Sequence, residues 1–157
     1  MSYFVEKDVS YKGMRLVVID SVGCYEMHRC GYVGIWNDHP FYKFSYYAET
    51  RIPKTVLNDE PCGDRGIIDI FCAATNPSKY AKISHLINVH GSLTYSTVRM
   101  PATYPVHSNN LWFFGFDCAH YGDDRRYWTT ERVLQECYRL ANELERWRRY
   151  CLDEQSM

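Results

Sequence analysis

Residues 111–118 read LWFFGFDC, the most apolar run of the chain, and the polar residues 119–124, AHYGDD, follow it directly. An apolar run of this length that stops at turn-forming residues is typical of a buried β-strand. Two similar runs, at residues 14–19 and 32–36, also end at an aspartate or at a turn cluster. The three runs together predict a sheet that includes the strand at 111–118.

The C-terminal residues 129–151 predict one long helix. Apolar residues recur there at three- and four-residue intervals, and Thr129 or Thr130 can cap the first turn. Glu131 lies where the helix dipole favours an anion. The opposite face carries arginine and glutamate of mixed sign, so we expect it to face solvent while the apolar stripe faces the core.

Further apolar runs at residues 66–74, 83–89 and 93–98 predict additional strands, with the last two paired to each other. Residues 49–66 hold two prolines and two glycines and predict a loop. Several strands and one terminal helix favour an α+β fold. We expect a single domain over residues 1–157, with a mostly antiparallel or mixed sheet packed against the helix.

Composition limits the class of protein. A formal net charge of −1 disfavours a partner that is long nucleic acid or a membrane, yet it permits a small phosphorylated ligand. We find no apolar signal segment or membrane-spanning run, and we expect the seven cysteines to be reduced thiols in a cytoplasmic protein. The fourteen tyrosines predict either a half-wet surface or the lining of a pocket.

Two segments place reactive side chains where predicted strands end. One reads VHGSLTYS, residues 89–96, and the other reads GFDCAHYGDD, residues 115–124. Each carries a histidine and a glycine close to it, and glycine permits tight bends and close approach of a ligand. Loops held by a rigid sheet are where binding and catalysis concentrate. The two segments are therefore the candidate functional site.

The predicted catalytic residues are His90 and His120, as a general acid and base, because histidine titrates near neutral pH. Asp117 or Asp123 can orient one imidazole through its ring N–H. A histidine pair suits cleavage of a phosphodiester whose own 2′-hydroxyl is the nucleophile. The alternative is that each histidine is a structural hydrogen-bonding residue.

Hydroxyl and aromatic side chains beside the histidines are the predicted ligand-binding groups. Thr94 and Ser96 can hold a phosphate, and tyrosines can stack on a base. His39 precedes a proline, so an ordinary turn is its alternative role. The predicted ligand-binding residues are Thr94, Tyr95, Ser96, Tyr32, His39 and Tyr121.

A metal site is a further alternative, although we expect no cofactor. Cys118 and His120 are separated by one residue, a spacing that matches no common zinc pattern, and Cys118 is expected to be a packed thiol. The chain also lacks the P-loop, dinucleotide-binding, zinc-protease and serine-hydrolase motifs. A divalent-metal hydrolase stays open, with ligands Asp117, His120, Asp123 and His90.

The same residues resemble the sequence pattern of a family of small phage and bacterial proteins without an assigned activity. The resemblance covers roughly residues 30–144, and its segments here are Gly31-Tyr32-Val33, His39-Pro40, His90 to Ser96, Leu111 to Asp123 and Glu136-Cys137. The chain departs from the pattern at Ser92, where the family has glycine, and at Leu111, where it has tryptophan. The resemblance implies a phage protein in the host cytoplasm. Some small phage proteins bind or cleave nucleotide immune signals, which suggests a counter-defence role.

These observations favour metal-independent cleavage of a phosphodiester in a cyclic or modified nucleotide. One alternative is a binding protein that sequesters a signalling nucleotide without changing it, and the second is the metal-dependent hydrolase. A protein that forms homo-oligomers or interacts with other proteins stays open as well. The distance between the His90 and His120 rings is the observation that best distinguishes these candidate functions, since a shared site is implausible beyond about 12 Å.

Overall fold

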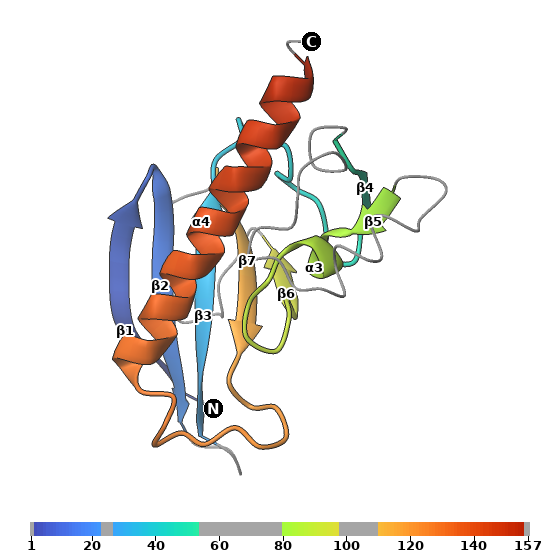
Figure 1. The fold of residues 1–157 in the computed structure, drawn as a ribbon. Coiled ribbons are helices and arrows are strands. Elements are labelled where there is room, and N and C mark those ends of the chain that lie inside the picture. Colours follow the sequence, from blue (N-terminus) through green and yellow to red (C-terminus); the bar gives the residue numbers. More distant parts are fainter. Residues whose placement is uncertain (1, 23–26, 54–79, 98–109, 156–157) are drawn as a thin grey trace.

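The computed structural model describes residues 2–22, 27–53, 80–97 and 110–155. An antiparallel five-stranded sheet has the order β1-β2-β3-β7-β6, and the long helix α4 lies obliquely across one face (Figure 1). The elements are β1 (Ser2–Tyr11), β2 (Met14–Val22), β3 (His28–Ile35), β6 (Tyr95–Thr97), β7 (Trp112–Asp117) and α4 (Thr130–Gln155). The predicted α+β fold, a sheet packed against a terminal helix, is confirmed.

A tight hairpin joins β1 to β2. Lys12 and Gly13 form its turn with φ of 50° and 76°, and paired left-handed residues match the twist of two antiparallel strands. The sequence does not predict β1, because its charged residues 6–8 interrupt any apolar run. The strand lies at the edge of the sheet and pairs only with β2 among the described strands, a position that tolerates charge.

The segment before the candidate site differs from the prediction. Residues 83–89 were expected as a strand, but Ile83–Leu86 forms the short helix α3, and residues 87–89 lead into the turn at His90. The prediction was wrong because a short apolar run does not by itself distinguish a strand from a buried helical turn. The predicted pairing of 93–98 with this run was also wrong, since β6 pairs with β7.

Two short strands precede α3. Part of the predicted loop 49–66 is ordered as β4 (Glu49–Arg51), which pairs with β5 (Tyr80–Lys82). The rest of that loop beyond Pro53 lies outside the described residues, and so does the predicted strand at 66–74.

Close contact between α4 and the sheet is centred on Gly31 of β3. A side chain at Gly31 would lie within 2.4 Å of the Phe116 ring and 2.7 Å of Cys137 Sγ, so only a glycine lets these groups approach. The buried stripe of α4 is the predicted one, and it includes Val133, Cys137, Leu140, Ala141, Leu144 and Trp147. This packing fixes where the helix begins relative to the end of β7.

The described part of the chain contains no helix with the length and apolarity needed to cross a lipid bilayer. Cys30, Cys118, Cys137 and Cys151 form no disulfide, in line with the predicted reduced cysteines, and the other three cysteines lie outside the described residues.

Candidate functional site

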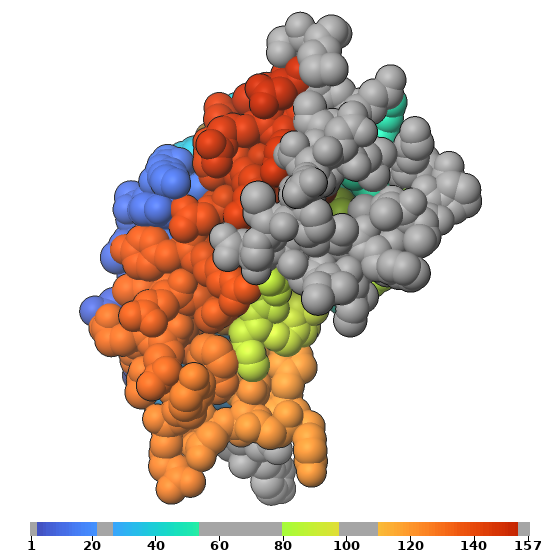
Figure 2. Space-filling model, viewed as in Figure 1, coloured from blue at the N-terminus to red at the C-terminus, as the bar shows by residue number. Residues whose placement is uncertain are grey.

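Two turns bring the predicted histidines together on the α4 side of the sheet. One turn follows α3 and carries His90, and the other follows β7 and carries His120. Figure 2 shows the yellow-green segment before β6 lying directly against the orange segment that follows β7. The centroids of the two imidazole rings are 5.9 Å apart, and the rings are nearly perpendicular. This separation is well inside the limit for a shared site.

Asp123 connects the two histidines. Its carboxylate lies 2.9 Å and 3.1 Å from His90 Nε2, and it accepts a hydrogen bond of 2.9 Å from the backbone N–H of His120. Burial disfavours the charge of Asp123, but the hydrogen bonds from the His90 side chain and the His120 backbone N–H outweigh it and lower the pKa of Asp123 below the ordinary value. Asp123 is therefore a carboxylate held between two imidazoles.

Two carboxylates lie beside the His120 ring. Its Nδ1 lies 3.3 Å from Asp117 Oδ1 and 3.5 Å from Asp123 Oδ2. That nitrogen is buried and makes no hydrogen bond within the described structure, although the side chain as a whole is 36% exposed. His120 therefore exposes the rest of its imidazole ring to solvent, and not Nδ1.

The turn at His90 needs glycine because it presses on His120. Gly91 has φ of 66°, and a side chain there would come within 2.3 Å of His120 Cε1. Ser92 follows with φ of 72°, a left-handed conformation that a residue other than glycine adopts with strain. The glycine of the resembling family at position 92 therefore suits this backbone better than the serine found here.

His90 is held from three sides. Its ring lies 4.1 Å from the Trp128 ring, its Nε2 contacts Asp123, and its backbone N–H donates to Glu136 Oε2 at 3.1 Å. Glu136 belongs to α4, so the helix places this turn directly. Trp128 is a site residue that the sequence does not reveal, because nothing in its local pattern distinguishes it from a core aromatic residue.

A pocket of about 520 Å³ opens beside His120. It is largely polar and contains both cationic and anionic groups. Its described lining residues are Met27, His28, Cys118, Ala119, His120, Tyr121, Gly122, Asp123 and Arg125. His90 is not among them, so His120 is the histidine that faces the pocket directly.

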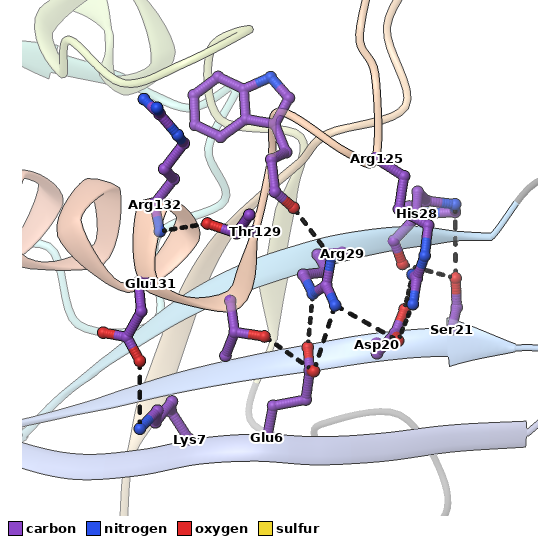
Figure 3. A network of polar contacts seen from close by, with 12 residues as sticks. Glu6, Lys7, Asp20, Ser21, His28, Arg29, Arg125, Thr129, Glu131 and Arg132 are labelled. Atoms are coloured by element: carbon purple, nitrogen blue, oxygen red, sulfur yellow. Dashed lines mark hydrogen bonds and ion pairs between the residues drawn. The ribbon is translucent and has the colours of Figure 1, made fainter.

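An ionic network fixes the segment between β7 and α4 to the sheet (Figure 3). Arg125 makes a two-pronged contact with Asp20 of β2, with Nη2 donating to Oδ2 at 2.6 Å. Arg29 of β3 bonds Glu6 at 2.7 Å and donates to the Trp128 carbonyl at 3.0 Å. The segment that carries His120 and Asp123 is thus braced by three strands.

The predicted ligand-binding residues divide between this site and other places. Thr94 Oγ1 donates to Asp117 Oδ2 at 3.1 Å, and the fully exposed Tyr121 lines the pocket.

Tyr32 and Tyr95 pack edge to face, with centroids 5.3 Å apart, in a separate apolar cluster. Ser96 Oγ accepts a hydrogen bond from the Tyr46 N–H. Because strand residues alternate between faces, Tyr32 lies on the side away from Gly31 and α4.

His39 lies apart from the other histidines. Its Nε2 donates to the Leu144 carbonyl at 2.8 Å, and its Nδ1 accepts from the Phe41 N–H at 3.0 Å. Leu144 is eight residues along α4 from Glu136, about 12 Å at the rise of a helix. Burial lowers the pKa of His39, which keeps the imidazole neutral. Both ring nitrogens of His39 are thus used in hydrogen bonds to backbone groups.

Cys118 is a packed thiol. It is buried on the strand end, and burial raises its pKa to about 12, with the nearby carboxylates acting in the same direction. A thiol that stays protonated at neutral pH is a poor nucleophile and a poor metal ligand. Cys118 is therefore not a candidate nucleophile.

His90, His120 and Asp123 also have the geometry of metal ligands. One ligand atom from each lies within 4.8 Å of the others, and Asp117 is next to His120. Two imidazoles and a carboxylate are a donor set that zinc and related divalent ions accept.

Comparison with family models, curated proteins and solved structures gave no match for this chain. The resemblance to the phage and bacterial pattern stays a prediction. Function is therefore inferred from the residues and geometry of the site.

Proposed function

We propose that this protein binds a small phosphorylated ligand in the pocket beside His120 and cleaves a phosphodiester bond with His120 and His90 as base and acid. The single observation that carries the proposal is the sharing of Asp123 by two imidazoles whose ring centroids are 5.9 Å apart. His120 lines the described pocket, and His90 lies next to it across the shared Asp123. The pocket supports a phosphorylated ligand, and the choice of a cyclic or modified nucleotide follows from the resemblance.

The step begins with a ligand that carries a free 2′-hydroxyl next to a 3′,5′-phosphodiester. His120, whose Nδ1 faces the two carboxylates, takes the 2′-hydroxyl proton at Nε2. The 2′-oxygen forms a bond to phosphorus while the bond from phosphorus to the 5′-oxygen breaks. His90 gives a proton from Nδ1 to the leaving 5′-oxygen, because its Nε2 faces Asp123. The products are a 2′,3′-cyclic phosphate and a free 5′-hydroxyl, and no water is consumed.

Cyclic dinucleotides provide the test. The protein is incubated with a panel of 3′,5′-linked cyclic dinucleotides, and the products are followed by mass spectrometry. Wild type should release a linear product ending in a 2′,3′-cyclic phosphate, and His120→Ala should lower turnover about 100-fold or more. His85→Ala is the matched control, because His85 is exposed on α3 and lines no described part of the pocket. Absence of turnover across the panel, or full turnover by His120→Ala, would refute the proposal.

Divalent-metal catalysis is the second candidate, favoured by the three ligand atoms that lie within 4.8 Å of one another. Here His90, His120 and Asp123 would hold the ion, which would polarise the phosphate and supply an activated water. Repeating the assay with EDTA separates the two mechanisms. Loss of turnover that Mn²⁺ or Zn²⁺ restores would replace the metal-independent proposal, whereas unchanged turnover would support it.

Sequestration without cleavage gives a different result in the same assay. The ligand would then stay bound through gel filtration and be released intact on heating. His120→Ala would weaken that binding, whereas a catalytic role lets the variant bind the ligand and fail to cleave it.

A further inference from the structure

One wall of the pocket is cationic and is built by residues outside the histidine pair. Arg125 lines the pocket and comes from the segment between β7 and α4. His28 lines it as well and comes from the start of β3. Figure 3 shows both side chains beside Asp20 of β2. Residues distant in sequence therefore meet at this wall.

Asp20 holds Arg125 in place. Its carboxylate is buried and contacts both terminal nitrogens of the guanidinium, and a second arginine, Arg29, lies 4.0 Å away. The hydrogen bonds from Arg125 lower the pKa of Asp20, so the carboxylate stays charged at neutral pH. A two-pronged contact uses two of the five N–H donors of arginine, and the remaining ones are available to an anion.

Two further residues of the pocket carry backbone donors. Tyr121 and Gly122 line the pocket, and their backbone N–H groups make no hydrogen bond within the described structure. Gly122 has φ of 89°, a conformation that helps successive N–H groups turn toward one side. The pocket thus offers backbone N–H donors and a fixed guanidinium on the wall.

We infer that Arg125, positioned by Asp20, and His28 form the binding wall for a phosphoryl group, which they hold beside His120. The inference rests on the proposed function only in taking this pocket as the ligand site, and it is the same for the metal-independent and metal-dependent mechanisms. Arginine is suited to the role because its planar fork matches two oxygens of a phosphate. Asp20 is a positioning residue that acts through Arg125.

Arg126 supplies an internal comparison. It has the same charge and is the next residue, but its side chain is 92% exposed. It contacts the neighbouring Asp124 and is not among the residues that line the pocket. A general effect of positive charge near the site would involve both arginines, whereas a built anion wall involves Arg125 alone.

Inorganic phosphate is the probe, titrated into the full-length protein and followed by calorimetry and by the NMR signals of the histidine rings. Wild type should bind phosphate with shifts at His120 and His28. Arg125→Ala should weaken binding about tenfold or more, and the matched control Arg126→Ala should change it less than twofold. Equal affinity of Arg125→Ala and wild type would overturn the inference, and so would shifts confined to residues outside the pocket.

Loss of the Asp20 partner is the main risk to folding, because a buried carboxylate left alone is costly. The double variant Asp20→Asn, Arg125→Gln removes both charges and should fold while binding phosphate as weakly as Arg125→Ala. The single variant Asp20→Asn keeps the Arg125 guanidinium but removes the carboxylate that holds it in place. This variant should weaken phosphate binding less than Arg125→Ala does. If the folded double variant bound phosphate with wild-type affinity, the proposed binding wall would be refuted.

The outcomes separate this inference from the proposed function. Phosphate binding that depends on Arg125, together with no turnover of any cyclic dinucleotide, would leave the wall standing and remove the proposed cleavage. Turnover that depends on His120 but is unaffected by Arg125→Ala would support the proposed cleavage and remove the binding wall. In the expected case, His120→Ala abolishes turnover while changing the phosphate affinity only a few-fold.

Discussion

Replacing Gly91 by alanine tests how the two turns of the site are held together. The backbone there has φ of 66°, and a left-handed conformation costs a residue with a side chain about 1–2 kcal/mol. The new methyl would lie 2.3 Å from His120 Cε1 and 2.6 Å from Nδ1, so the ring has to move by roughly 1 Å to reach ordinary contact.

That movement draws His120 Nδ1 away from Asp117 and Asp123. Displacing the packed ring in this way costs about another 1–2 kcal/mol. Gly91→Ala should therefore lower the free energy of unfolding by about 2–4 kcal/mol, measured by urea denaturation, and should lower turnover as well. Two effects of different origin are thus expected from one methyl group.

Gly13→Ala is the matched control. Gly13 has φ of 76°, but a side chain there would meet nothing within 4 Å. Its cost should be the backbone strain alone, about 1–2 kcal/mol, with turnover and phosphate binding unchanged. Equal losses of stability in the two variants, or His120 ring signals in Gly91→Ala that match wild type, would refute the contact between Gly91 and His120.

Three further predictions concern other parts of the chain. Ser92→Gly should raise the free energy of unfolding by about 0.5–1 kcal/mol in urea denaturation, because it relieves a left-handed serine, and a decrease would contradict this reasoning. Asp20 has a pKa lowered by its hydrogen bonds to Arg125, so its contribution is present above the unfolded-state pKa near 4 and is lost as the pH falls through the lower folded-state pKa. The stability of Asp20→Asn, measured by chemical denaturation between pH 6 and pH 2, should therefore fall less steeply than that of wild type; parallel curves would argue against the pairing. His39→Ala should lose about 2–4 kcal/mol in thermal or urea unfolding, since it leaves a cavity and two unpaired backbone groups, yet phosphate affinity should stay the same.

Local pattern is enough to predict the elements that carry the site. Bounded apolar runs predict the strands at 14–19, 32–36 and 111–118, and the three- and four-residue spacing of apolar residues predicts the helix from residue 129. The structure contains each of these elements. The two reactive segments are visible because histidine, aspartate and glycine are out of place in an apolar strand and mark where it stops. These signals depend only on residues that are neighbours in the chain.

Local sequence pattern does not predict the structure of a segment or the role of a side chain where tertiary packing determines it. Residues 83–89 satisfy a strand as well as a helical turn, and burial of Ile83 and Leu86 in the core selects α3. His39 and His90 look alike in sequence, since each lies at the end of an apolar run, but one is buried with both ring nitrogens bonded to backbone and the other faces a carboxylate. The difference lies in which part of α4 each residue meets.

The sequence by itself determined the main strands, the terminal helix and the two histidine-bearing segments, because periodicity and turn residues act over a few residues. Only the tertiary structure decided that His90 and His120 share Asp123, that Tyr32 and Tyr95 lie elsewhere, and that Arg125 meets Asp20. The physical reason is that a side-chain contact depends on strand order and helix placement. Those are fixed by burial of the whole core, and here by the fit of Cys137 and Phe116 against the bare backbone of Gly31.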